Sequence, residues 1–164
     1  MTGAGSWSLG ESDYRQISEH LTELLRESDA RCAMVVDRTG QLLATVGEAL
    51  SFDPTVFASL TAADFSANDQ LAKMIGEPEF ASLFHQGKKE SMYLADVGRR
   101  LILVVLFDQR TTVGLVRLRV KQTVQHLSQL IDEMFGRPSR GRLESERGGL
   151  LEGAEDEIDK LFED

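Results

Sequence analysis

Residues 99–107 read RRLILVVLF, the most apolar stretch of this chain and the one that decides its fold. Seven consecutive apolar residues follow the two arginines, without the alternation of polar and apolar side chains that marks a strand with one wet face. The run is far shorter than the roughly 20 residues that a membrane-spanning helix needs. We therefore expect a central β-strand in a sheet that helices cover on both faces.

Four further stretches predict the strands around this centre. Residues 31–37 (RCAMVVD) and 41–47 (QLLATVG) flank a turn at 38–40, which predicts a β-hairpin. Residues 91–95 (SMYLA) form a short strand with polar flanks. Residues 113–120 (VGLVRLRV) alternate with a period of two and predict a fifth strand.

Apolar residues spaced three and four apart predict the helices Glu11–Glu27, 53–75 and Thr123–Phe135. Asp53 and Pro54 open the middle helix as its cap and first turn, and Gly76 ends it. A shorter helical piece is expected over Glu79–His85. The order αββαβββα predicts an α/β fold, an α-β-α sandwich on a mostly antiparallel five-stranded sheet. The middle helix is expected on one face, and the first and last helices on the other.

The domain is expected to span residues 11–135, after a flexible N-terminus at 1–10. Residues 136–152 are rich in Gly, Arg, Ser and Glu, which is typical of a flexible linker. Residues 153–164 predict a short acidic helix with an apolar edge formed by Ile158, Leu161 and Phe162. Such a helix is too short to be stable alone, which favours folding against a partner. The alternative is that this tail docks on its own domain or nowhere.

The charge and the single cysteine exclude several classes of protein. The net charge of −9 argues against a nucleic-acid partner, and seven acidic residues of the segment 152–164 supply most of it. Cys32 has no partner for an intramolecular disulfide and suits a reducing cytosol, so we expect a cytoplasmic protein. The N-terminal residues lack the pattern of a signal peptide, and no membrane insertion is expected.

The motifs of known catalytic chemistry do not occur in this sequence. The segment Gly87-Lys88-Lys89 lacks the first glycine of a phosphate-binding loop. His20, His85 and His126 are too widely scattered to predict a zinc site. We therefore expect no enzyme, no catalytic residue, no cofactor and no metal, but a protein that acts by binding another protein.

Four segments together resemble the roadblock/LC7 family, and most closely its bacterial MglB-type branch. They are residues 36–43 (VDRTGQLL), 59–63 (SLTAA), 71–77 (LAKMIGE) and 107–119 (FDQRTTVGLVRLR). The resemblance implies a profilin-like α/β sandwich. It also implies a homodimer that activates a Ras-like GTPase of the MglA type, which acts as a switch in gliding motility and cell polarity.

The resemblance further implies how the dimer forms and acts. The strand Ser91–Ala95 would lie at the sheet edge and extend the sheet across the dimer, while the two middle helices lie side by side as a platform for one GTPase. Activation would realign residues of the GTPase itself, so that Arg110 is structural and not an inserted arginine finger. The C-terminal helix would contact the GTPase away from the platform and assist nucleotide exchange. The dimer contacts expected in that strand are Ser91, Met92, Tyr93, Leu94 and Ala95. We add Phe65 of the middle helix on separate grounds, because an exposed phenylalanine is unfavourable by roughly 1.5–3 kcal/mol relative to a buried one.

The middle helix carries two stripes that we assign to different roles. The first stripe is expected to face the sheet and consists of Leu60, Ala63, Ala67, Leu71 and Met74. The second has short or flexible side chains that let a GTPase approach, and consists of Ser59, Ala62, Ser66, Gln70 and Lys73. The sequence departs from the MglB branch by having polar residues, where the branch tends to have alanine and glycine, at Ser66, Asn68, Asp69 and Gln70.

Two alternatives stay open beside the GTPase activator. A roadblock scaffold or adaptor would bind a GTPase or another protein without accelerating hydrolysis. A small-molecule sensor or enzyme on a profilin-like shell would need a pocket with convergent polar groups.

Overall fold

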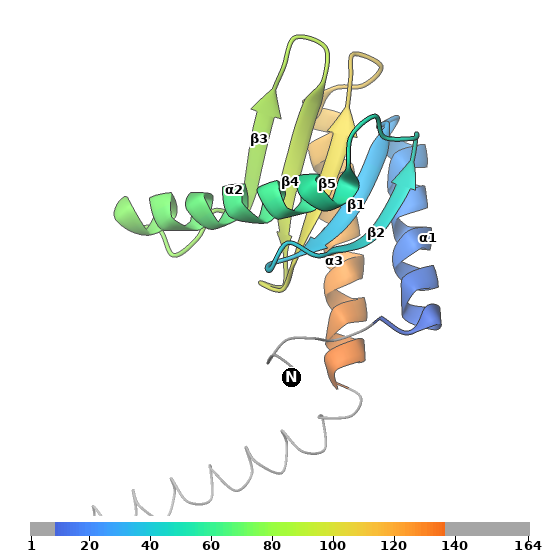
Figure 1. The fold of residues 1–164 in the computed structure, drawn as a ribbon, viewed down its shortest axis with the longest axis horizontal. Coiled ribbons are helices and arrows are strands. Elements are labelled where there is room, and N and C mark those ends of the chain that lie inside the picture. The colour runs from blue at the N-terminus through green and yellow to red at the C-terminus, as the bar shows by residue number, and fades with distance from the viewer. Residues whose placement is uncertain (1–8, 137–164) are drawn as a thin grey trace, which may run out of the picture. The chain divides into compact units, whose positions relative to one another are not determined.

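The computed structural model describes residues 9–136 and arranges them as five strands and three helices (Figure 1). The predicted linker at 136–152 lies, but for its first residue, outside the described residues. The predicted acidic helix at 153–164, with Ile158, Leu161 and Phe162, lies wholly outside them. In chain order the elements are α1 (Glu11–Ser28), β1 (Cys32–Asp37), β2 (Leu42–Gly47), α2 (Pro54–Met74), β3 (Ser82–Gln86), β4 (Ser91–Val97), β5 (Leu101–Phe107) and α3 (Val113–Gly136).

The sheet has the strand order β2-β1-β5-β4-β3, and every neighbouring pair is antiparallel. The apolar strand β5 lies in the middle, as its sequence predicted, and Leu101–Val105 are fully buried. In Figure 1, α2 crosses one face of the sheet, while α1 and the part of α3 up to Ser128 lie behind the other. Both the element order αββαβββα and the α-β-α sandwich are therefore confirmed.

Successive side chains of a strand point to opposite faces of the sheet, so every second residue faces α2 and contributes to the core on that side. This core consists of Cys32, Met34, Val36, Ala58, Phe65, Leu94, Ile102 and Val104. The opposite face receives α1 through its buried residues Ile17, Leu21 and Leu24. Among the described residues, the chain divides into two units between Ser128 and Gln129, and the sheet belongs to the first. Within residues 9–136, no helix is long and apolar enough to cross a bilayer.

One strand of the sheet comes from a segment that the sequence predicted as helical. Residues 82–86 (SLFHQ) form the edge strand β3 and pair with β4. Their pattern has a period of two, because Leu83 packs into the core beside α2 while Phe84 stacks on Phe107 from the other face. Ser91–Ala95 consequently lies inside the sheet, and the prediction that it forms the sheet edge is wrong.

Residues 113–120, predicted as a strand, are instead the first part of α3. Val116, Val120 and Thr123 are buried at a spacing of three and four, whereas Leu118 is exposed. The hydroxyl of Thr112 accepts a hydrogen bond from the backbone N–H of Leu115 at 3.3 Å, which satisfies one free donor of the first turn. Over only eight residues, the apolar positions of this segment fit both the strand period of two and the helix period of 3.6. Packing against the rest of the protein decides in favour of the helix.

The start of α2 forms as predicted. The Asp53 carboxylate accepts a hydrogen bond from the N–H of Thr55 at 2.9 Å, and Pro54 occupies the first helical position. The β1–β2 turn packs against this helix. Gly40 in that turn has φ of 97°, and a Cβ added there would lie 3.0 Å from the Cα of Ser59. Glycine is therefore required both by the backbone and by the approach of α2.

Candidate functional site

Helix α2 faces the sheet with a different stripe from the one that the sequence predicted. Its buried residues are Ala58, Thr61, Ala62, Phe65, Asn68 and Ala72. The stripe that was assigned to the sheet points away from it, since Leu60 is 65% exposed and Met74 is 82% exposed. The helix has small or apolar residues on most of its surface, so periodicity alone does not select the inner face. Alanines around one phenylalanine let the helix lie close to the strands.

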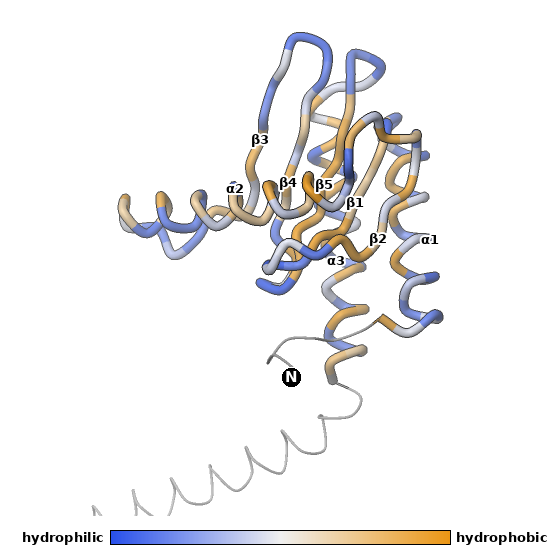
Figure 2. Tube along the Cα trace, in the orientation of Figure 1, coloured by the Kyte–Doolittle hydropathy of each residue, from blue (hydrophilic) through white to orange (hydrophobic). Residues whose placement is uncertain are grey.

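The outward side of α2 is therefore apolar over its whole length. We define the outer apolar stripe as Val56, Leu60, Ala63, Ala67, Leu71 and Met74, all of which are exposed. Figure 2 shows apolar residues recurring along α2 out to the end that projects beyond β3. Large apolar side chains grouped on one exposed helix face are typical of a surface that binds another protein.

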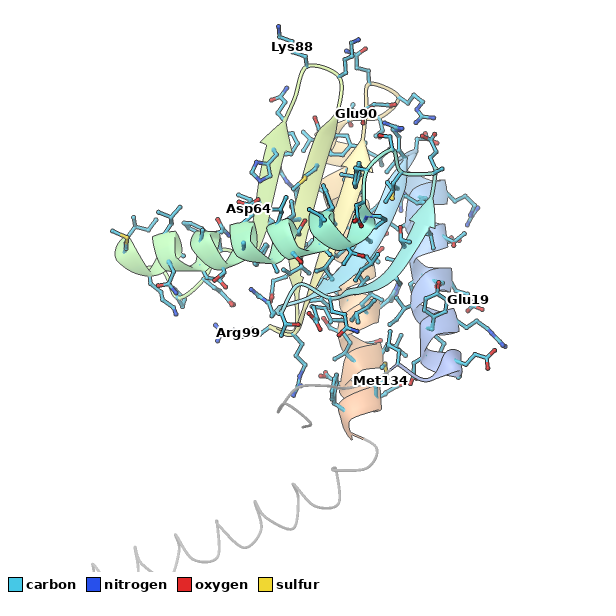
Figure 3. All side chains as sticks on the ribbon, in the orientation of Figure 1. Glu19, Asp64, Lys88, Glu90, Arg99 and Met134 are labelled. Atoms are coloured by element: carbon cyan, nitrogen blue, oxygen red, sulfur yellow. The ribbon has the colours of Figure 1, made fainter. Side chains whose placement is uncertain are left out.

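The predicted GTPase-binding residues follow one flank of the outer apolar stripe. Ser59, Ser66, Gln70 and Lys73 are exposed or partly exposed, whereas Ala62 is buried. Three of the five, Ala62, Ser66 and Lys73, line a polar cleft of about 320 Å³. The other residues of this cleft come from neighbouring positions, elements and loops: Arg38, Asp69, Pro78, Glu79 and Arg99. Arg99, which Figure 3 labels, follows the end of β4.

Arg38 contacts residues from several of the elements that line or support the cleft. The sequence did not predict this role. Its Nη1 lies 2.9 Å from Oδ2 of Asp69, its Nη2 pairs with Asp96, and its guanidinium lies 4.7 Å from the ring centroid of Phe65. The two acidic partners are 31 and 58 positions away along the chain, so no local spacing could have linked them. Arg38 Nε is buried without a hydrogen-bond partner among the described residues.

These contacts give roles within the protomer to two of the four polar residues singled out in the middle helix, which are Ser66, Asn68, Asp69 and Gln70. Asn68 is buried against the sheet, and the carboxylate of Asp69 pairs with Arg38. Of the four, Ser66 and Gln70 are left as the polar residues that a protein approaching α2 would meet.

The residues expected at a dimer contact lie mostly inside the protomer. Phe65 is 0% exposed in the core below α2, and Tyr93, Leu94 and Ala95 are buried in β4. Ser91 and Met92 are partly buried. We expected Phe65 at a dimer contact because an exposed phenylalanine is unfavourable. The side chain is instead buried against the sheet of its own protomer. Within residues 9–136, the strand that offers a free edge on this side of the sheet is β3.

A second cavity opens beside the first turn of α2 and has a volume of about 530 Å³. We call it the apolar pocket. Its apolar lining consists of Cys32, Ala49, Leu50, Phe52, Phe57, Met92 and Leu106. The thiol of Cys32 lies in its wall, and burial raises the pKa of this thiol, so it is a neutral, apolar group here.

The lining of the apolar pocket also includes the charged residues Arg31, Glu48 and Glu90, which form ion pairs. Arg31 Nε lies 2.7 Å from the Glu48 carboxylate, and the same guanidinium pairs with Glu90. Arg110 lies 2.9 Å from Glu48 and 3.0 Å from Asp108. Hydrogen bonds from Arg31 and Arg110 lower the pKa of Glu48. Arg110 is thus held by two carboxylates of its own chain.

The histidines are less scattered than the sequence suggested. The rings of His20 on α1 and His126 on α3 lie 5.2 Å apart, and burial together with His126 lowers the pKa of His20. His85 Nε2 lies 2.7 Å from the carboxylate of Asp64, which Figure 3 labels on α2. Among the described residues, no group of three or more His, Cys, Asp or Glu side chains could hold a metal ion.

Known proteins share this architecture and part of this sequence. A family model described as the roadblock/LC7 domain matches residues 16–107, from α1 through β5. MglB of Myxococcus xanthus is 40% identical with a TM-score of 0.72, and the match covers 77% of this chain and 95% of that one. The gliding protein MglB of Thermus thermophilus is 31% identical with a TM-score of 0.73, covering 80% and 99%. An uncharacterised protein of Methanocaldococcus jannaschii is 27% identical over 111 residues, which are 68% of this chain and 96% of that protein.

Proposed function

This chain belongs to the roadblock/LC7 family, and from that premise we propose that it is a non-enzymatic, homodimeric regulator of a Ras-like small GTPase of the MglA type. The observation that carries the proposal is the outer apolar stripe of α2, an exposed apolar face on a chain that is 40% identical to an MglB protein. The proposal places the regulator in the cytoplasm and gives it a role in motility or cell polarity.

The dimer would use the free edge of β3 and the outward side of α2. Pairing of two β3 strands would join the two sheets and satisfy backbone groups that the edge leaves open. The same arrangement would bring the two α2 helices side by side on one face of the joined sheet. Burial of those apolar side chains of α2 that contact the partner helix would supply stabilising free energy, at roughly 25 cal/mol for each Å² of apolar surface removed from water.

The GTPase would then contact the flank of α2 that carries Ser59, Ser66, Gln70 and Lys73, with Ala62 beneath them. These side chains are short or flexible, so a G domain can approach the helix closely. Arg110 has a structural role in the proposal, because its own chain already pairs it with Glu48 and Asp108. Stimulation would come from realigning residues of the GTPase itself. The C-terminal residues Ile158, Leu161 and Phe162 would assist nucleotide exchange from a second contact.

Phosphate release from a purified MglA-type GTPase tests this proposal. The wild-type chain is expected to raise the rate of GTP hydrolysis. Ser66→Arg and Gln70→Arg should each abolish the increase, because a long charged side chain on the flank of α2 blocks approach. The matched control is Glu19→Arg, which adds the same side chain on the exposed side of α1 (labelled in Figure 3) and should keep the full rate.

Two other outcomes would each contradict the proposal in a different way. Binding without a rate increase would show the adaptor alternative, in which the dimer only positions a GTPase. Equal rates for wild type, Ser66→Arg and Gln70→Arg would remove the flank of α2 as the binding site.

A further inference from the structure

Among the described residues, strand β3 has no helix over the face of the sheet opposite α2 (Figure 1). On that face one flank of α3 packs against α1, since the side chains of Arg119 and Glu27 lie 3.2 Å apart and the rings of His126 and His20 adjoin. The other flank of α3 faces the two outer strands, β4 and β3. This arrangement leaves a groove between α3 and the edge of the sheet.

Two hollows form this groove, which we call the back groove. The first has a volume of about 330 Å³, and its apolar lining includes Tyr93, Ala95, Val120 and Val124. The second has a volume of about 260 Å³ and is lined by Phe84 and Phe107. The ring centroids of Phe84 and Tyr93 lie 6.5 Å apart, so aromatic side chains connect the two hollows.

Four cationic side chains border the back groove, and none of them has an ion pair within residues 9–136. Arg117 and Lys121 line the first hollow. Lys88 and Lys89 line the second, and Figure 3 labels Lys88. The Arg117 guanidinium lies 5.9 Å from the ring centroid of Tyr93, which places positive charge directly beside the aromatic floor.

The acidic residues in the lining do not neutralise these four cations. Asp96 pairs with Arg38, and Asp108 pairs with Arg110. Hydrogen bonds from Arg110 lower the pKa of Asp108, which is the effect of a carboxylate that is already held by its partner. The back groove thus suits a ligand that is apolar on one side and acidic on the others.

The segment 153–164 of this chain has that chemistry. Its apolar residues Ile158, Leu161 and Phe162 lie at positions i, i+3 and i+4, the spacing with which an amphipathic helix inserts its anchors into a groove. Residues 152–164 also hold seven acidic side chains against the single Lys160. A helix of this length is marginal alone, so contact with an apolar floor and with unpaired cations would favour it.

The linker is long enough to bring this segment back to its own chain. Helix α3 has 24 residues and is about 36 Å long at 1.5 Å of rise per residue. Residues 137–152 can extend over about 50 Å at roughly 3.3 Å per residue. A flexible tether of this kind also gives an effective concentration of the order of millimolar, so that a weak contact suffices.

We propose that residues 155–164 dock in the back groove of the same chain, with Ile158, Leu161 and Phe162 on its floor. Docking there leaves the flank of α2 open, because the back groove lies on the opposite face of the sheet. The back groove and a GTPase would then compete for the same apolar residues, so that the segment reaches the GTPase only after it leaves the groove. This competition rests on the proposed function, whereas the docking does not.

Chemical linking of two engineered cysteines in the full chain tests the docking without a GTPase. All variants carry Cys32→Ser, which removes the native thiol, and Asp159→Cys, which lies outside the apolar edge of the segment. Ser82→Cys adds a thiol in the lining of the back groove, and the matched control Ser59→Cys adds one at an exposed position of α2. A short bismaleimide should link the pair with Ser82→Cys at least five times faster, measured by mass spectrometry of the digested chain.

Two results of this experiment would overturn the docking. The first is an equal rate of linking for the two pairs. The second is a product of twice the chain mass in place of the internal link. Because no GTPase is present, either result is independent of the phosphate-release experiment, and a failure of that experiment would leave the docking untouched.

Reversal of one charge on the wall of the back groove gives a second readout. Lys121→Glu should slow the linking of Ser82→Cys to Asp159→Cys at least threefold, because it replaces attraction to the acidic segment by repulsion. Lys121 is exposed and has no ion pair within residues 9–136, so the fold should be unaffected, which thermal unfolding verifies. The matched control Arg15→Glu makes the same change of charge on the exposed side of α1 and should leave the rate unchanged. An equal effect of the two reversals, or none from Lys121→Glu, would contradict docking against this wall.

Discussion

Arg38 is the side chain on which the geometry of the α2 cleft depends most. It stands in the β1–β2 turn and holds Asp69 of α2 and Asp96 at the end of β4, while its guanidinium covers the ring of Phe65. Three elements that are distant in sequence are thereby joined by one planar group with a fixed fork of donors. Because the pairs are largely shielded from water, they are screened less than pairs on the open surface.

Replacement of Arg38 by methionine should destabilise the protein. Arg38→Met keeps the apolar contact with Phe65 but leaves the carboxylates of Asp69 and Asp96 without their cation. We expect the free energy of unfolding to fall by about 1–3 kcal/mol, the usual cost of leaving shielded polar groups unsatisfied. Urea denaturation measures it. The control Arg26→Met breaks an exposed pair with Glu23 and should change stability little. A similar loss in both variants would contradict the structural role of Arg38.

At the scale of the element, α2 and the turn that it contacts act as one unit. Gly40 lies where the turn approaches α2, and its positive φ and the nearby Cα of Ser59 both disfavour a side chain there. The N-terminal half of α2 is thus held by the turn and by the Asp53 cap, while its C-terminal end projects past the sheet.

A pair of glycine variants separates backbone strain from this close contact. Gly40→Ala and Gly76→Ala both place alanine at a positive φ, 97° and 88°, but a Cβ at Gly76 meets no described atom within 4 Å. Strain alone costs roughly 1–2 kcal/mol. Gly40→Ala should lose clearly more stability than Gly76→Ala in thermal unfolding, because it also pushes α2 away. Equal losses would mean that the turn and the helix do not press on each other.

The elements that the sequence predicted correctly carry unambiguous signals. The run LILVVLF at 101–107 has the length of a buried strand and forms β5, and Asp53-Pro54 fixes the start of α2 through local hydrogen bonding. The wrong predictions of helix and strand concern short segments whose apolar positions fit both the helical period of 3.6 and the strand period of two. Residues 82–86 and 113–120 are such runs, and contacts with distant residues decide between helix and strand.

The candidate site was predicted in part for the same reason. The flank with Ser59, Ser66, Gln70 and Lys73 reaches the surface, as expected. The inner and outer stripes of α2 were exchanged, because alanine and leucine alternate around the helix and only the shape of the sheet selects between them. Arg38 and the apolar pocket were missed, since each is assembled from residues that are far apart in sequence.

At the scale of the whole molecule, the account requires that the acidic C-terminal segment acts separately from the dimer. Deletion of residues 153–164 should leave the dimer intact, because the proposed dimer uses only α2 and β3. The same deletion should weaken binding of the GTPase or slow nucleotide exchange, measured by titration with a fluorescent nucleotide. Unchanged affinity and unchanged exchange would remove the tail from the proposal.

The central claim is that two copies pair and that their α2 helices together form a surface that one G domain recognises. Light scattering on a mixture of this protein with an MglA-type GTPase in its GTP-bound form measures this most directly. The account predicts a dimer alone at micromolar concentration, and with the GTPase a complex whose mass equals two copies of this chain and one G domain. A monomer that forms no complex with the GTPase would contradict the claim.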